Sequence, residues 1–150
     1  MDTTTDPVGV IERQTALLNR NFELLYRRSA VHDTLDRAEY LLLRTLMESG
    51  PMDINSLAGR LGLDPSTAGR QVAVMRKAGL VECEPAPTDR RRSIITPTPD
   101  GLDRAESVRE RRTEGFVQLL ADWSEDELRT LGEVFTHYNA AVARYYLPSP

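Results

Sequence analysis

The helix-starting and helix-ending residues in the middle of the chain, which are aspartate, proline and glycine, constrain the fold more than any other feature. Asp53 precedes a short stretch with helical apolar spacing that ends at Gly62, and Asp64-Pro65 begins a second such stretch. Aspartate accepts hydrogen bonds from the free backbone N–H groups of a helix start, and proline at the first helical position leaves no N–H unpaired. Gly79 stands where a helix commonly ends with a left-handed residue. Two short helices joined by a glycine-containing turn predict a helix-turn-helix.

A β-hairpin is expected directly after these two helices. Residues 80–84 alternate between apolar and polar side chains like a half-buried strand, Pro85 begins a turn, and residues 93–96 are expected to form the returning strand. The connecting loop ends in one aspartate and three arginines at residues 89–92. A hairpin with a basic tip after a helix-turn-helix predicts a wing, although three arginines on a loop are also often only a solvated charge cluster.

Longer helices are expected on both sides of this central part. Residues 8–30 repeat apolar side chains every seven positions along two adjacent lines, and residues 35–48 form an apolar-faced helix before a glycine-proline pair. A third helix is expected over about residues 99–122, and a capping-box pattern at residues 124–127 begins the last one. The last helix carries an unbroken seam with spacings of three and four, which consists of Leu128, Leu131, Phe135, Tyr138, Val142 and Tyr145.

The net charge of −4 hides an asymmetry along the chain. Residues 60–92 carry 7 basic and 4 acidic side chains, whereas residues 1–59 carry 6 and 9, and residues 93–150 carry 6 and 10. Affinity for nucleic acid depends on the local density of lysine and arginine where phosphates lie, and not on the total charge. The central segment is therefore where DNA is expected to bind.

Composition argues against several other classes of function. The chain has 2 histidines and 1 cysteine, which are too few for a cluster of metal ligands or a disulfide framework. No glycine-rich phosphate loop or nucleophile motif occurs, so we expect neither an enzyme nor a cofactor. The polar, acidic start and the lack of about 20 consecutive apolar residues predict a cytoplasmic protein without a secretory signal or a membrane span.

Three segments carry a resemblance to a known family. They comprise residues 54–63, residues 64–70 together with 77–81, and Asp89-Arg90-Arg91 followed ten residues later by Pro99-Asp100-Gly101. In this order and spacing they resemble the MarR (multiple antibiotic resistance regulator) family of transcription regulators, and the likeness covers nearly the whole chain. The resemblance implies a mostly α-helical, α+β winged helix-turn-helix fold with a two-stranded wing.

The family layout divides the chain into a DNA-binding lobe and a dimerisation region. The resemblance implies a winged helix-turn-helix lobe over residues 35–98 and an intertwined homodimer formed by residues 8–30 and 99–146. The apolar seams agree with such a dimer, although packing of the three helices within one chain would also cover them. Arg109 and Arg112 interrupt one seam, so this part is not expected to form a continuous apolar zipper.

Two residues depart from the family pattern. Pro97 stands where leucine is usual, which predicts that the second wing strand ends early. Gly69 stands in the second short helix where threonine or a similar residue is common, and it weakens that helix by up to about 1 kcal/mol relative to alanine. The glycine would also let the backbone approach DNA closely.

The start of the second short helix is the expected site of base recognition, because that end of a recognition helix enters the major groove. Arginine can bind guanine through two hydrogen bonds. The simpler alternative for the two hydroxyl residues is helix capping. The candidates for base contacts are Ser66, Thr67, Arg70 and Gln71.

The rest of that helix is expected to divide between two environments. Val72 and Met75 are expected to face the core of the lobe. Arg76 and Lys77 are expected to contact phosphates or to remain in solvent.

At the wing, the resemblance implies that Asp89 steadies Arg91 through an ion pair. Arg91 or its neighbour Arg90 is then expected to enter the minor groove, where narrow A·T-rich segments attract arginine. Arg92 is placed with them among the expected DNA contacts.

Many MarR-like proteins release DNA when a small, often aromatic, acid binds between the dimer helices and the DNA-binding lobe. Tyr26, His32, Tyr40 and Arg44 lie on the helices expected to line such a cavity. The simpler alternative makes them core aromatics, a surface histidine and a surface charge. Cys83 in the first wing strand is expected to be a buried and inert thiol.

The resemblance therefore implies a repressor that binds a pseudo-palindromic operator in double-stranded DNA as a homodimer, and that is released by a small aromatic or phenolic effector. Two other classes stay open from the residues alone, namely an enzyme and a module that uses its wing to bind proteins. A mobility-shift assay on random duplex at low salt separates the DNA-binding regulator from these two alternatives, because only the regulator gives a shift.

Overall fold

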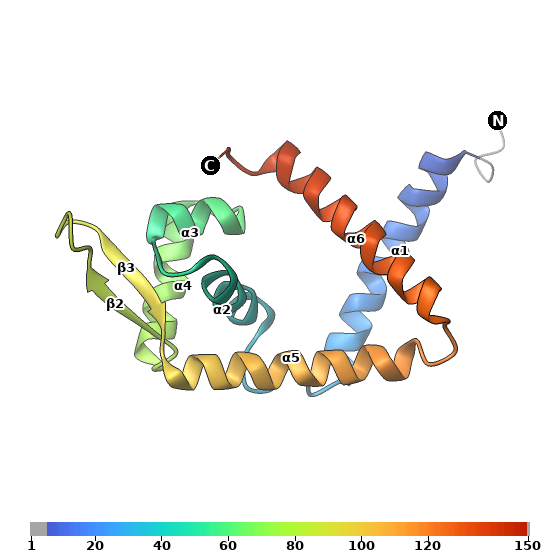
Figure 1. Ribbon diagram of the computed structural model, residues 1–150, viewed down its shortest axis with the longest axis horizontal. Coiled ribbons are helices and arrows are strands. Elements are labelled where there is room, and N and C mark those ends of the chain that lie inside the picture. The colour runs from blue at the N-terminus through green and yellow to red at the C-terminus, as the bar shows by residue number, and fades with distance from the viewer. Residues whose placement is uncertain (1–5, 150) are drawn as a thin grey trace. The chain divides into compact units, whose positions relative to one another are not determined.

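The computed structural model describes residues 6–149, so the first half of the acidic start, residues 1–5, lies outside the described residues. The chain divides into two compact units, of which one ends at Thr34 and the other begins at Leu35. The first unit contains the helix α1 (Pro7–Arg28), and the second unit contains all other elements (Figure 1).

The helix α1 begins at a cap that the sequence analysis did not single out. The carboxylate of Asp6 accepts hydrogen bonds from the backbone N–H groups of Val8 and Gly9, each at 3.2 Å, and Pro7 takes the first helical position. None of the 22 residues of α1, all of which are described, is buried. The predicted helix over residues 8–30 is confirmed, with its ends shifted by one or two residues.

The second unit begins with three helices whose ends are set by local capping. Asp53 and Asp64 are the N-caps of the second and third of these helices. Gly62 and Gly79 follow them with left-handed backbone angles, at φ of 67° and 75°, which side chains with a Cβ rarely adopt. The predicted helix-turn-helix is therefore confirmed. The three helices are α2 (Arg37–Ser49), α3 (Ile54–Leu61) and α4 (Pro65–Lys77).

A three-stranded antiparallel sheet packs with these helices, in the strand order β1-β3-β2. Ile95 in the central strand pairs with Cys83 on one side and with Met52 on the other. The wing hairpin is two-stranded as predicted, but the first strand of the sheet was not foreseen, because two residues show no alternation. The strands are β1 (Met52–Asp53), β2 (Val81–Pro85) and β3 (Ser93–Pro97).

The expectation that the second wing strand ends before Pro97 was wrong, because Pro97 is paired with Val81. The backbone N–H of Thr98 donates to the carbonyl oxygen of Leu80 at 3.0 Å. Hydrogen-bonded and non-bonded pairs alternate along an antiparallel ladder, so the neighbouring Val81–Pro97 pair needs no N–H from the proline. On the other side of β3, the strand β1 pairs only with Ile94 and Ile95, so no hydrogen bond from Pro97 to β1 is needed.

The helix α5 (Pro99–Leu119) closes the lobe through a close approach of backbone to backbone. The hydroxyl of Thr98 donates to the Gly79 carbonyl oxygen at 2.6 Å and accepts from the Gly101 backbone N–H at 3.0 Å. A Cβ atom on Gly101 would lie 2.2 Å from the carbonyl oxygen of Leu80. Glycine is therefore required here by space. The helix ends at Leu119, earlier than the predicted residue 122.

The buried apolar side chains of residues 6–149 all lie between Leu35 and Val108. The last helix, α6 (Glu125–Tyr146), contributes none of them. Its predicted capping box is confirmed, because the Ser124 backbone N–H donates to Glu127 at 2.8 Å and the Glu127 backbone N–H donates to Ser124 at 3.2 Å. None of the helices in residues 6–149 combines the length and the apolar character that a membrane span needs.

Candidate nucleic-acid interface

The start of α4 carries a polar network around one carboxylate. Asp64 accepts hydrogen bonds from the Thr67 backbone N–H at 3.0 Å, from the Thr67 hydroxyl at 2.6 Å, and from the Ser66 hydroxyl. Arg70 donates to the Thr67 hydroxyl oxygen at 3.2 Å. The bond from the Ser66 hydroxyl, followed by those from Thr67, holds the pKa of Asp64 well below its usual value. The helix is thus capped by Asp64, and the two hydroxyls support the cap rather than form it.

The helix α4 has one buried face and one exposed face. Val72 and Met75 are buried together with Ala68, which confirms that the first two face the core. The expected DNA contacts on this helix lie outside that packed face. Ser66, Arg70, Arg76 and Lys77 are exposed, and Thr67 and Gln71 are half-buried.

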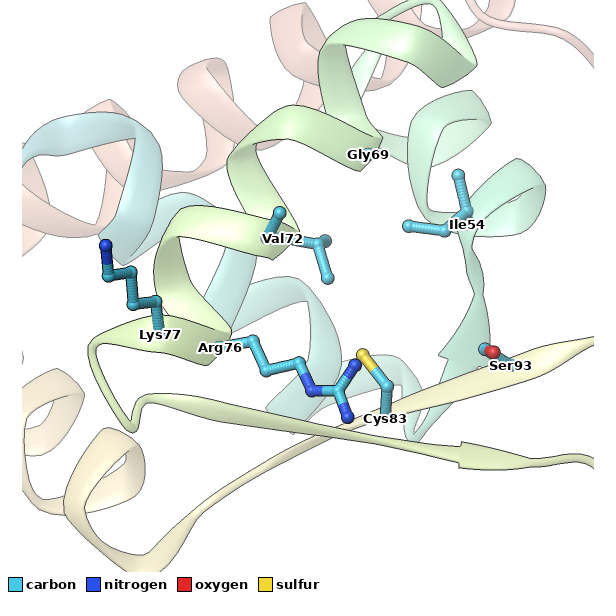
Figure 2. A pocket seen from close by; sticks show the side chains of 8 residues that line it. Ile54, Gly69, Val72, Arg76, Lys77, Cys83 and Ser93 are labelled. Carbon is cyan, nitrogen blue, oxygen red and sulfur yellow. The ribbon is translucent and has the colours of Figure 1, made fainter.

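An open groove of about 650 Å³ runs between α4 and the wing (Figure 2). Arg76 and Lys77 line it from the helix, and Ser93 lines it from β3. Gly69 also lines the groove, and a Cβ atom there would meet no atom within 4 Å. Packing therefore does not require glycine at position 69, and close approach to DNA stays a prediction for this residue.

Cys83 was expected to be buried, and this expectation was wrong. Its side chain is half-buried and, like that of Arg76, lines the groove (Figure 2). Alternation along β2 places Cys83 on the same face as the buried Val81. Towards the tip of the hairpin the core no longer covers this face of β2, so Cys83 is less buried than Val81.

At the wing tip, Asp89 holds the backbone of Arg91 rather than its side chain. The Asp89 carboxylate accepts a hydrogen bond from the Arg91 backbone N–H at 3.0 Å, and no ion pair joins their side chains in the part of the chain that is described. The ion pair implied by the resemblance is therefore replaced by a turn-forming bond, of the kind that aspartate commonly makes two residues ahead. Arg90 and Arg91 are both exposed.

Arg92 makes the long-range ion pair of the wing. Its Nε donates to Oδ2 of Asp53 at 2.8 Å, and its terminal nitrogen bonds to the same oxygen. Asp53 also accepts from the Ser56 backbone N–H at 2.9 Å as the N-cap of α3. The sequence analysis did not find Asp53 as a partner of the wing, because nothing local relates residues 39 positions apart.

Of the four residues expected to line an effector cavity, Tyr26 and His32 lie in the first unit, and Tyr40 and Arg44 lie in the second. In the first unit, the rings of Tyr26 and His32 lie 5.2 Å apart between centroids. In the second unit, the guanidinium of Arg112 lies 5.3 Å from the ring centroid of Tyr40, at a distance typical of cation–π contact. Arg44 forms an ion pair with Glu48 within α2. Arg112 was not predicted as a neighbour of Tyr40.

Residues 6–149 contain no group of three histidine, cysteine, aspartate or glutamate side chains that could hold a metal ion. The chemistry that the surface offers is instead that of cationic and hydroxyl groups. The hydroxyls and Arg70 lie at the start of α4, and Arg90 and Arg91 lie at the wing tip. A capped recognition helix and a basic hairpin on one helix-turn-helix lobe define a winged helix-turn-helix protein.

Comparison with known proteins identifies the family. The MarR family model matches residues 35–93. The Bacillus subtilis HTH-type transcriptional regulator YxaD is 33% identical over 136 residues, which cover 91% of this chain and 95% of that protein. The chain therefore belongs to the MarR family, and it is a DNA-binding transcription regulator and not an enzyme.

Solved structures share the fold over nearly the whole chain. The crystal structure of RV1404 from Mycobacterium tuberculosis matches with a TM-score of 0.75 and 24% identity, and covers 96% of this chain and 97% of that one. The PcaV transcriptional regulator from Streptomyces coelicolor, solved in complex with its natural ligand, matches with a TM-score of 0.67 and 23% identity over 95% and 97% of the two chains. The predicted winged-helix fold is confirmed.

Proposed function

We propose that this regulator binds a pseudo-palindromic operator in double-stranded DNA as a homodimer, and that it represses transcription until a small aromatic or phenolic acid releases it. The observation that carries the proposal is the exposed start of α4 beside a basic wing on one lobe. DNA as the partner implies action in the cytoplasm, which stays a prediction.

Bases are read by the start of α4. Both hydroxyl hydrogens there are directed to Asp64, so the oxygens of Ser66 and Thr67 present lone pairs rather than donors. Such oxygens accept hydrogen bonds from the amino groups of adenine or cytosine. Arg70 supplies the donors for guanine. Gln71, half-buried beside it, is the fourth residue of the proposed base-reading set.

Phosphates are contacted from the groove between α4 and the wing, and the DNA minor groove is contacted from the wing tip. Arg76 and Lys77 offer positive charge along its helical side, where a phosphate backbone would release counterions. Arg90 and Arg91 extend from the wing tip and enter the minor groove. Asp89 fixes the turn that presents them, through its bond to the Arg91 backbone.

The homodimer is formed by the helices within residues 8–30 and 99–146. The helices α1 and α6 have 22 residues each, and neither has a buried residue within the described chain. Along the seam of α6, Tyr138 is 51% exposed and Val142 is 37% exposed. Helices with apolar seams gain most of their stability from packing, so an uncovered seam favours a second copy as the covering surface.

The effector is proposed to act through Tyr26, His32, Tyr40 and Arg44. Two aromatic rings, an imidazole and a guanidinium are the groups that an aromatic acid would use for stacking and for its carboxylate. The structure of PcaV in complex with its natural ligand supports ligand binding by a chain of this fold. Release of DNA would require that the effector binds the free form better than the DNA-bound form.

Selection of bound duplexes from a random pool tests the DNA-binding part of the proposal. We expect an enriched inverted repeat, with half-sites separated by about one helical turn, as a symmetric dimer requires. Enrichment of a single unrepeated site would contradict the dimeric operator. Titration of salicylate into the complex on that duplex, followed by mobility shift, tests release, and an unchanged shift with a panel of aromatic acids would contradict effector control.

A further inference from the structure

One carboxylate joins three parts of the lobe. Asp53 is the last residue of β1, the N-cap of α3 and the partner of Arg92. Its side chain is only 15% exposed, whereas that of Arg92 is 52% exposed. The hydrogen bonds from Ser56, followed by that from Arg92, lower the pKa of Asp53 from 3.8 to about 2. The carboxylate is therefore charged at all ordinary pH values.

The sheet explains why these two side chains meet. The register places Asp53 opposite Ile94, and Arg92 lies two residues before Ile94. Side chains two residues apart point to the same face of a strand, and diagonal neighbours across a ladder are within reach of a long side chain. The short strand β1 thus brings the helix-turn-helix and the wing into contact at one ion pair.

Arg92 also closes the turn at the wing tip. Its carbonyl oxygen accepts from the Ala86 backbone N–H at 2.7 Å, and its backbone N–H donates to the Asp89 carbonyl oxygen at 3.1 Å. The main chain of Arg92 fixes the base of the tip, while its side chain is bonded to Asp53. Arg90 and Arg91 extend beyond this base, and within residues 6–149 their side chains form no hydrogen bond or ion pair with the rest of the lobe.

We propose that Asp53 and Arg92 are positioning residues for DNA binding, which hold the wing at a fixed place relative to α4 so that Arg90 and Arg91 meet the minor groove. The proposal rests on the wing contact described under Proposed function. It assigns to Arg92 a role different from that of its two neighbours, because its guanidinium is already bonded to a carboxylate. Freeing the wing would make DNA binding order it again at an entropic cost.

Two single variants separate positioning from direct contact. Asp53→Asn keeps a good N-cap for α3 and removes the charge that holds Arg92. Arg92→Gln removes the guanidinium. On the duplex enriched by the selection, we expect each variant to bind about fivefold more weakly than the parent, and the double variant to bind no more weakly than either one. Arg92→Lys retains an ion pair and should recover most of the affinity.

The salt dependence of binding distinguishes a positioning role of Arg92 from a phosphate contact. If Arg92 is not a phosphate contact, Arg92→Gln leaves the slope of log affinity against log salt unchanged. A phosphate contact would instead lower that slope by about one unit, and Asp53→Asn would then leave affinity equal or raise it. That pair of results would overturn the proposal. Arg129→Gln on α6, where Arg129 pairs with Glu125 and Asp126, controls for the loss of one charge.

Arg91→Ala distinguishes failure of this proposal from failure of the wing contact. We expect Arg91→Ala to weaken binding, and Asp53→Asn to have a smaller further effect in that background than in the parent, because only Arg90 then remains to be positioned. If Arg91→Ala weakens binding but Asp53→Asn does not, only the positioning role is overturned. If neither Arg91→Ala nor Asp53→Asn changes binding, both the wing contact and the positioning role are overturned. If Asp53→Asn weakens both backgrounds equally and lowers the melting temperature, the pair only stabilises the lobe.

Discussion

The DNA-binding lobe and the two outer helices are built from the same local signals, yet they differ completely in burial. The helices α3 and α6 both begin at a side-chain cap, and both carry apolar side chains at helical spacing. The helix α3 buries Leu57 and Ala58 within the chain, whereas α6 buries no residue. A cap and a seam therefore determine that a helix forms, but not what it packs against.

The first prediction concerns the closure of the lobe and has the largest expected effect. Gly101→Ala should lower the free energy of unfolding by about 3 kcal/mol or more, because its Cβ would lie 2.2 Å from a backbone oxygen that cannot rotate away. Gly115→Ala in the same helix is the matched control, since a Cβ there meets nothing within 4 Å. The control should raise stability by up to about 1 kcal/mol. Equal denaturation midpoints for the two variants would contradict the close approach.

The second prediction tests whether the outer helices are completed by a second copy. Tyr138→Glu should raise the dissociation constant of the dimer by about tenfold or more, because a charge would enter the seam that the second copy covers. Ala140→Glu introduces the same charge on the opposite side of α6 and should leave association unchanged. Sedimentation equilibrium measures both. Since Tyr138 is half-exposed in the isolated chain, equal behaviour of the two variants would point to another covering surface.

The third prediction separates the lobe's recognition surface from its core. Arg70→Ala should cost about 1–3 kcal/mol of binding on the enriched duplex if the side chain reads a guanine. The melting temperature should not change, because Arg70 is exposed. Arg104→Ala, on an exposed face of α5, provides a charge-matched control. Equal weakening on enriched and random duplex would make Arg70 a phosphate contact.

The smallest effect is expected for acid stability of the lobe. The pKa of Asp53 is about 2 in the folded protein and 3.8 ordinarily, so its ionised form stabilises the fold above about pH 4. This contribution is lost as the pH falls from about 4 towards 2. Asp53→Asn should therefore lose less stability than the parent between about pH 6 and pH 3, as measured by urea denaturation. An identical loss in both would show that Asp53 is not held in its charged form.

The prediction of the helices succeeded where the deciding interactions are local. The aspartate caps of α3 and α4 bond to backbone N–H groups three residues ahead. The left-handed Gly62 and Gly79 follow from the backbone freedom of glycine. Such interactions span a few residues, so a single sequence carries them in full.

The candidate site could be predicted only in part. Helical spacing correctly placed Val72 and Met75 in the core, and the exposed face of α4 followed from them. The same kind of reasoning failed for Cys83, because alternation tells which face a side chain takes but not how far the core extends beneath that face. The role of Asp89 also differed, since a bond to the Arg91 backbone replaces the ion pair that the resemblance implied.

The sequence by itself determined the order of elements, their caps and the basic character of the central segment, because these depend on neighbours along the chain. Only the tertiary structure decided the third strand, the pairing of Asp53 with Arg92, and the contact of Arg112 with Tyr40. Each of these joins residues far apart in sequence. Their partners are selected by the packing of α2, α3 and α5 around one core, which no local pattern encodes.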